Sequence, residues 1–85
     1  MKLTNLSDII VLKKSLTDLQ SSDEGKVIID FLETFCGYNQ SGYRTDPYEI
    51  AYNAGRRDVI LTIKTIIDPR VKPEDIVETY KLLGE

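Results

Sequence analysis

An aspartate-proline pair stands at each end of the longest helical pattern in this sequence. At the start, Asp46 is the predicted N-cap, Pro47 suits the first helical position, and Glu49 completes a capping box. At the end, Asp68-Pro69 stops the helix, because a residue that precedes proline disfavours the helical conformation. The β-branched residues between 59 and 67 leave a β-strand as the alternative, but the length of the pattern and its strong start favour a helix.

Aliphatic residues at three- and four-residue spacing predict a first helix from about Asn5 to Gln20. Asn5 with Asp8 three positions later is the favoured N-cap pair, and Thr4 and Ser7 are the alternatives. A last helix is predicted over 73–84, where a proline begins it and a glycine ends it. Its apolar side contains Ile76, Val77, Tyr80 and Leu83.

The second helix is predicted to begin with a capping box of Ser21 and Glu24. It is predicted to end at Gly37, because glycine adopts the left-handed conformation at little cost. The charged residues Lys26, Asp30 and Glu33 lie on one side of this helix. The opposite side is one stripe that we expect to lie in the core: Val27, Ile28, Phe31, Leu32 and Phe35.

About four short helices in 85 residues predict an all-α fold, a small bundle in a single helical domain over 1–85. With 41% hydrophobic residues, the chain is too apolar for a disordered protein. No apolar run approaches the roughly 18 residues of a membrane span, and the start lacks the pattern of a secretory signal. We therefore expect no membrane partner.

The helix over 47–67 is unusual because apolar residues occupy two of its sides. Such a helix is either central in its bundle or uses one side to bind a partner, and we favour the central position. The main stripe contains Tyr48, Tyr52, Gly55, Val59, Ile63 and Ile66, and nearly opposite lie Ile50, Ala54 and Leu61.

Gly55 removes a side chain from the main stripe, which lets another backbone approach closely. We expect close packing against the second helix, and the alternative is room for a partner's side chain. Arg56 lies at the edge of the same stripe and is expected to pair with Asp30 or Glu33.

Aromatic and basic residues gather around the loop between the second and third helices. Tyrosine and arginine are enriched at binding hot spots, because they bury area while keeping a polar group. We interpret Tyr48 and Tyr52 as core, and the loop as the best candidate for a contact surface. A short basic stripe on the third helix is interpreted as a solvated face, with phosphate contact as the alternative. The candidate contact residues are Tyr38, Tyr43 and Arg44 in the loop, with Arg57 and Lys64 of the basic stripe, which also includes Asn53.

The composition argues against an enzyme. The chain contains no histidine and one cysteine, so zinc sites and Ser-His or Cys-His catalysis are not available to it. Cys36 follows an apolar stripe and is expected to be a buried small hydrophobe. A glycine-rich phosphate-binding motif is also missing, so we expect no cofactor.

Between Asp23 and Asp68, several short motifs follow one another in a recognisable order. They are Glu24-Gly25-Lys26, Phe35-Cys36-Gly37, Asp46-Pro47, Ala51-Tyr52, Gly55-Arg56-Arg57 and the aliphatic run 59–63. In this order they resemble a family of small proteins of tailed bacteriophages, a domain named after a product of a Bordetella phage. The resemblance covers a core over 23–68 and leaves 1–22 and 69–85 as helical flanks. It implies a viral origin among phage morphogenesis genes and no catalytic residues. It also assigns Asp46, Pro47, Tyr52, Gly55 and Arg56 to a shared structural motif.

These observations favour a non-enzymatic phage protein that acts through protein-protein contacts. We expect an internal, head-to-tail or ejected virion component or an assembly factor, whose partners are other phage structural proteins or further copies of itself. The expected location is the virion or the bacterial host cytoplasm. One alternative is a nucleic-acid-associated packaging or regulatory accessory, which the net charge of -3 disfavours. Another is a phage-encoded inhibitor of a host enzyme.

Overall fold

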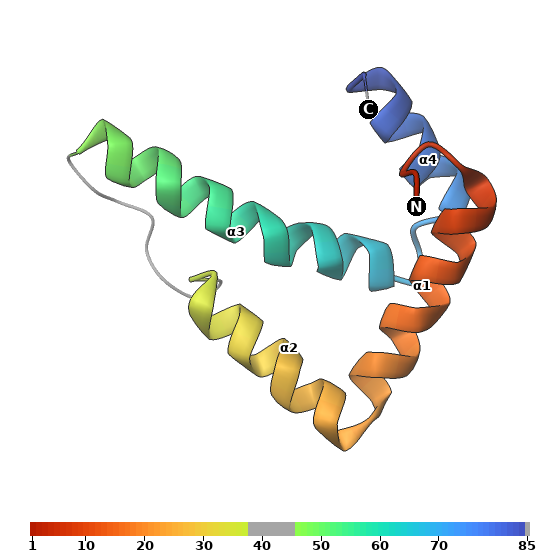
Figure 1. The fold of residues 1–85 in the computed structure, drawn as a ribbon, viewed down its shortest axis with the longest axis horizontal. Helices are drawn as coiled ribbons and strands as arrows, with labels where there is room; N and C mark the ends of the chain where they lie inside the picture. The colour runs from red at the N-terminus through yellow and green to blue at the C-terminus, as the bar shows by residue number, and fades with distance from the viewer. Residues whose placement is uncertain (38–45, 85) are drawn as a thin grey trace.

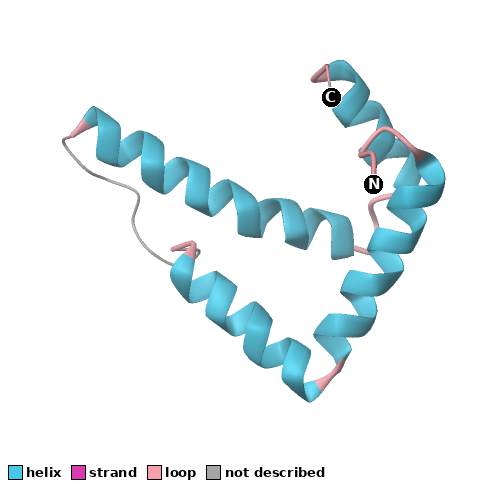
Figure 2. Cartoon of the chain, viewed as in Figure 1, coloured by secondary structure: helices cyan, strands magenta, loops and turns pink. Residues whose placement is uncertain are grey.

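The computed structural model describes residues 1–37 and 46–84, and in these ranges the chain forms four α-helices and no strand (Figures 1 and 2). The first three helices outline a triangle, and the fourth lies against the first near the N-terminus. The predicted all-α bundle is confirmed. The helices are α1 (Leu6–Ser21), α2 (Asp23–Phe35), α3 (Pro47–Ile67) and α4 (Pro73–Leu82).

Local capping explains most of the helix boundaries. The Asn5 side chain accepts a hydrogen bond from the Asp8 amide at 3.1 Å, so the favoured N-cap pair is confirmed. The Asp46 carboxylate likewise accepts from the Tyr48 amide at 2.9 Å, with a proline at the next position. Gly37 follows α2 with a φ of 67°, which is the expected left-handed conformation.

The start of α2 differs from the prediction by one residue. Ser22, and not Ser21, is the N-cap, and its hydroxyl accepts from the Gly25 amide at 2.9 Å. The Ser21 hydroxyl instead donates to the Thr17 carbonyl within α1 at 3.0 Å. The reason is that α1 continues through Ser21, so one residue alone joins the two helices.

This tight joint depends on Gly25. A Cβ atom at Gly25 would lie 1.5 Å from the Leu19 carbonyl oxygen and 2.7 Å from the Ser22 hydroxyl. Both distances are far below van der Waals contact, so a side chain at this position forces the backbone of the joint to move. Gly25 is therefore the glycine at which two helices meet closely.

The core lies where α1, α4 and the end of α3 meet. Its buried members are Ile9, Ile66, Ile76 and Val77. Leucines of α1 and Tyr80 of α4 pack around them. The predicted apolar side of α4 is therefore buried at its first turn, while Leu83 beyond the helix is exposed.

The predicted inward stripe of α2 is largely wrong, although Leu32 is partly buried as expected. Val27, Ile28, Phe31 and Phe35 are exposed, although each was expected in the core. The helix instead turns inward the side on which Gly25, Ile29, Leu32 and Cys36 recur at helical spacing. Apolar residues therefore occupy two adjacent sides of α2. The close joint at Gly25 favours burial of the side that begins with Gly25 and ends with Cys36, both of which are small residues. Buried Cys36 confirms the expectation for the cysteine.

The predicted main stripe of α3 is also largely wrong. Tyr48, Tyr52 and Val59 are exposed, whereas Ile60 is completely buried. Together with Ile66 and the partly buried Ile63, Ile60 shows that α3 is covered only along its C-terminal two-thirds. Figure 1 shows the start of α3 extending past the end of α2, so none of the other described helices lies beside its first turns.

Candidate interaction surface

Two stacked phenylalanines are exposed on α2. The rings of Phe31 and Phe35 have centroids 5.8 Å apart and an interplanar angle of 24°. Their exposed fractions are 59% and 52%, and Val27, one turn earlier on the same side, is 70% exposed. Large apolar side chains in a soluble protein are rarely exposed side by side unless they form a contact surface.

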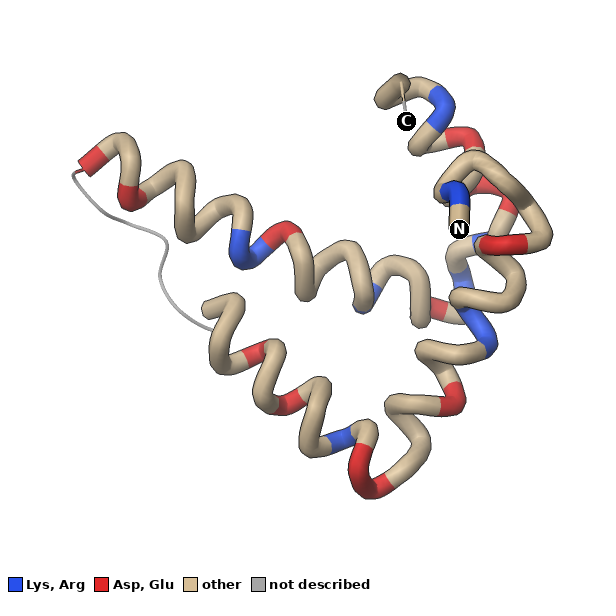
Figure 3. The backbone as a smooth tube through the Cα atoms, viewed as in Figure 1, with Lys and Arg blue, Asp and Glu red and all other residues tan. Residues whose placement is uncertain are grey.

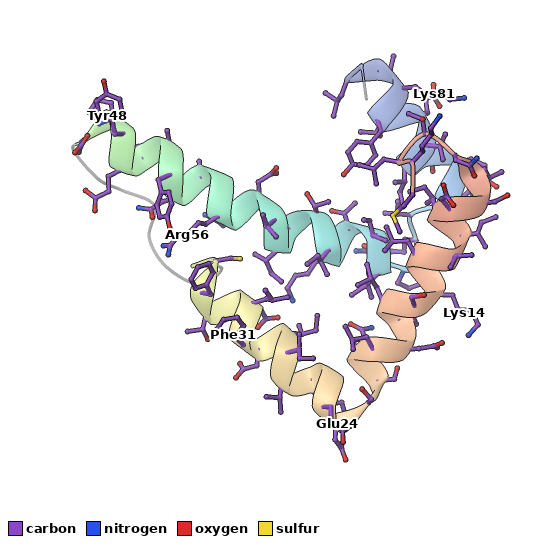
Figure 4. All side chains as sticks on the ribbon, viewed as in Figure 1. Lys14, Glu24, Phe31, Tyr48, Arg56 and Lys81 are labelled. Carbon is purple, nitrogen blue, oxygen red and sulfur yellow. The ribbon has the colours of Figure 1, made fainter. Side chains whose placement is uncertain are left out.

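Arg56 connects this pair to α3. Its guanidinium carbon lies 5.7 Å from the centroid of the Phe35 ring and 5.1 Å from that of Tyr52, within the range of cation-π contacts. Figure 4 shows Arg56 extending from α3 toward α2. We call Phe31, Phe35, Tyr52 and Arg56 the aromatic surface, because these contacts make one continuous group across two helices.

The expected pairing of Arg56 with Asp30 or Glu33 is wrong. Within the described ranges, its polar partner is the Asn53 side chain, which accepts from Nη2 at 3.1 Å. The buried Nε atom has no hydrogen-bond partner there. The guanidinium is held by aromatic faces and one amide, so its positive charge is not neutralised by a carboxylate of the described residues.

The outward side of α3 continues the aromatic surface along the helix. Tyr48 precedes Tyr52 by four residues and is 87% exposed. Gly55 follows Tyr52 by three residues, and a Cβ atom there would have nothing within 4 Å. The expected close packing of Gly55 against the second helix is therefore wrong. The position is open space, which leaves the alternative of room for a partner's side chain.

The residues predicted as partner contacts have different outcomes. Tyr38, Tyr43 and Arg44 lie outside the described residues. Arg57 is exposed on α3 and is followed by Asp58 in the sequence. Figure 3 shows basic and acidic segments adjoining near the middle of this helix. Lys64 does not lie on a free basic face, because its ammonium group contacts the Glu33 carboxylate at 2.6 Å.

The Glu33–Lys64 ion pair ties α2 to α3. Its side chains are 25% and 36% exposed, respectively. Glu33 lies opposite the predicted apolar stripe, and its inward position follows from the same rotation of α2 that exposes the phenylalanines. With Lys64 engaged in this way, the predicted basic stripe loses one of its two cations for phosphate contact.

A second lysine fixes the other end of α3. The Lys13 ammonium group of α1 donates to the carbonyl oxygens of Ile66 and Asp68 at 2.8 and 2.7 Å. These carbonyls belong to the C-terminal end of the helix, where a positive charge is favourable. Spacing alone does not point to Lys13, because its partners are more than fifty residues away in the chain.

The turn after α3 holds the carboxyl group with the clearest perturbation. The Asp68 carboxylate accepts hydrogen bonds from the Arg70 guanidinium at 2.8 and 3.1 Å and from its amide at 2.9 Å. These hydrogen bonds lower the pKa of Asp68 to about 2, and the side-chain hydrogen bonding from Arg70 is the largest cause. The pair closes a turn at the surface and lies away from the aromatic surface.

A mainly apolar hollow of ≈ 340 Å³ lies between α3 and α4. Leu61, Ile76 and Tyr80 are among its lining residues, and Asp58 and Asp75 contribute the carboxylates. Thr62, Thr65 and Thr79 add hydroxyl groups to the lining. No group of three potential metal ligands occurs in the described ranges.

None of the helices described here is both long and apolar enough to cross a membrane.

A family model described as Bbp19-like phage protein matches residues 17–79. The match confirms the resemblance to a phage family and extends it into both expected flanks, over the end of α1 and most of α4. Comparisons with curated proteins and with solved structures found no match. Since the family model covers most of the chain, the chain belongs to the Bbp19-like phage proteins.

Proposed function

We propose that this Bbp19-like phage protein acts without catalysis, through protein-protein contacts with other phage proteins or with further copies of itself, as a component of the virion or of its assembly pathway. The observation that carries the proposal is the aromatic surface. Three aromatic rings and an arginine without a carboxylate partner among the described residues lie together at the surface of α2 and α3. Tyrosine and arginine are the residue types that most often dominate binding energy at protein interfaces.

The inner contacts of α2 and α3 suit this role, because they hold the surface in place. The Glu33–Lys64 pair joins the two helices, and Ile60 of α3 is completely buried. Arg56 then keeps Phe35 and Tyr52 in one group. A surface that is ordered before binding loses less conformational entropy on association.

The test is the protein composition of purified particles of the source phage, measured by quantitative mass spectrometry. We expect this chain at a fixed ratio to the portal protein, or, for an assembly factor, defective particles when its gene is deleted. Normal assembly in the deletion mutant together with absence from the particles would overturn the proposal.

Complementation of the deletion mutant connects the function to the surface. Phe35→Glu is expected to lower the phage titre, because a charge replaces a ring in the stacked pair. Val11→Glu is the control, since Val11 is a well-exposed apolar residue of α1 outside the aromatic surface. Equal titres for the two variants would contradict the assignment of this surface.

A further inference from the structure

The chain exposes more surface than a monomer of its mass should. Its accessible surface is 6313 Å². The scaling of surface with mass gives about 5,100 Å² for a monomeric protein of 9.7 kDa, so about 1,200 Å² is in excess. The radius of gyration of 14.4 Å likewise exceeds the about 12 Å of a compact chain of this length.

The excess corresponds to the area of one protein interface. A standard-size interface buries about 800 Å² on each partner, and interfaces of permanent dimers are larger and more apolar. The aromatic surface, with Val27 on one side and Tyr48 on the other, supplies apolar area of this kind. A second copy related by a two-fold axis would cover the same patch on both molecules at once.

The exposed side of α2 is also complementary to itself. Val27, Phe31 and Phe35 follow at intervals of four residues, with the small side chain at one end and Phe31 in the middle. In an antiparallel arrangement about a two-fold axis at Phe31, Val27 of each copy faces Phe35 of the other. Small residues then oppose large ones, which is the condition for close packing between helices.

From the excess surface and this self-complementary stripe we propose that the aromatic surface is the dimer interface of this protein, with the two α2 helices antiparallel across a two-fold axis near Phe31. Two-fold dimers are the commonest oligomers, and their interfaces pair one patch with itself. This inference rests on the proposed function, because it names the partner of the same surface. The other occupants to consider are a different phage protein, a host protein and a lipid surface.

Sedimentation equilibrium of the purified full chain, from about 1 to 500 µM, measures the association. We expect a monomer-dimer equilibrium for the natural sequence. Phe31→Glu removes two central rings per dimer and is expected to weaken association at least about 100-fold. Val27→Glu is expected to weaken it in the same direction. Val11→Glu should leave the association unchanged, because Val11 lies on α1 outside the aromatic surface. It is a matched control for Val27→Glu, since the exposed fractions of Val11 and Val27 are similar, at 63% and 70%.

Three results would overturn the proposal: a natural chain that stays monomeric, a dimer that Phe31→Glu leaves intact, or equal weakening by Val11→Glu. Far-ultraviolet circular dichroism establishes that each variant keeps its helices. Should Phe31→Glu fail to fold, Val27→Glu decides in its place. A monomeric chain that is nevertheless found in particles assigns the surface to another phage protein and leaves the proposed function standing. In the converse result, the chain forms a dimer but is absent from the particles, and particles assemble normally without its gene. That result supports this inference and overturns the proposed function.

An oxidative cross-link tests the axis itself. A residue on a two-fold axis lies beside its own copy, so Phe31→Cys in a Cys36→Ala background is expected to form a disulfide-linked dimer. Val11→Cys in the same background is the control and should remain monomeric on non-reducing gels. Failure of Phe31→Cys to cross-link while the chain still dimerises would overturn the antiparallel arrangement.

Discussion

The same substitution at two helical glycines should change stability in opposite directions. Gly25 and Gly55 both lie inside helices, and alanine is the replacement that helices prefer. At Gly55 the added methyl group meets no atom within 4 Å. At Gly25 it meets the Leu19 carbonyl oxygen at 1.5 Å.

The magnitudes follow from these surroundings. Gly55→Ala is expected to raise the free energy of unfolding by about 1 kcal/mol, the difference in helix propensity between the two residues. Gly25→Ala gains the same propensity but forces the joint between α1 and α2 apart. Overfilling a close contact costs typically about 1–3 kcal/mol, so we expect a net loss of stability. For a domain of this size, about 1 kcal/mol moves Tm by roughly 4–8 °C.

Urea unfolding followed by circular dichroism measures both variants against the natural chain. A protein concentration of about 1 µM limits any contribution from association, which makes apparent stability depend on concentration. Equal slopes of the unfolding free energy against urea will show that the variants expose similar surface on unfolding. A destabilised Gly55→Ala, or a Gly25→Ala at least as stable as the natural chain, would refute the packing described for these helices.

Three further predictions concern the polar contacts of α3. Lys13→Met is expected to lower the free energy of unfolding by about 1–3 kcal/mol, because two carbonyls lose a charged donor. Lys14→Met, the control, should have a much smaller effect, and equal thermal unfolding of the two variants would contradict the stabilising role of Lys13. The lowered pKa of Asp68 contributes stability that is present above the usual aspartate pKa of about 4 and is lost as pH falls toward 2. The Tm difference between Asp68→Asn and the natural chain should therefore shrink as pH falls through this window, and a constant difference from pH 6 to about 2 would exclude the linkage. A double-mutant cycle on Glu33 and Lys64 should give a coupling of about 0.5–1 kcal/mol that decreases with salt, and additive effects would show that the pair does not tie α2 to α3.

Helix existence and boundaries depend on short-range chemistry, which is why they could be predicted. The N-cap of α3 needs only an oxygen at Asp46 and the fixed φ of Pro47. Gly37 and Gly84 were recognised as stops because the left-handed conformation suits glycine. The boundary error at the start of α2, Ser21 for Ser22, lies where either serine satisfies the same local rule and the length of α1 decides.

Which side of each helix faces inward could not be predicted in the same way. On α2 and α3 apolar residues occupy more than one side, so periodicity alone gives two acceptable orientations. The joint at Gly25 turns the side with Ile29 and Cys36 inward and leaves Phe31 exposed. Periodicity placed Gly55 in a close contact between helices, whereas the close contact occurs at Gly25, where α1 meets α2.

By itself, the sequence determined four helices, their caps and membership of a phage family, because those properties depend on neighbouring residues and on motif order. Only the tertiary structure decided that Lys64 pairs with Glu33 and that Arg56 lies between Phe35 and Tyr52. The physical reason is that these contacts join side chains of different helices. Their formation depends on how α2 and α3 rotate about their axes, and that rotation is set by close packing at the joint of α1 and α2.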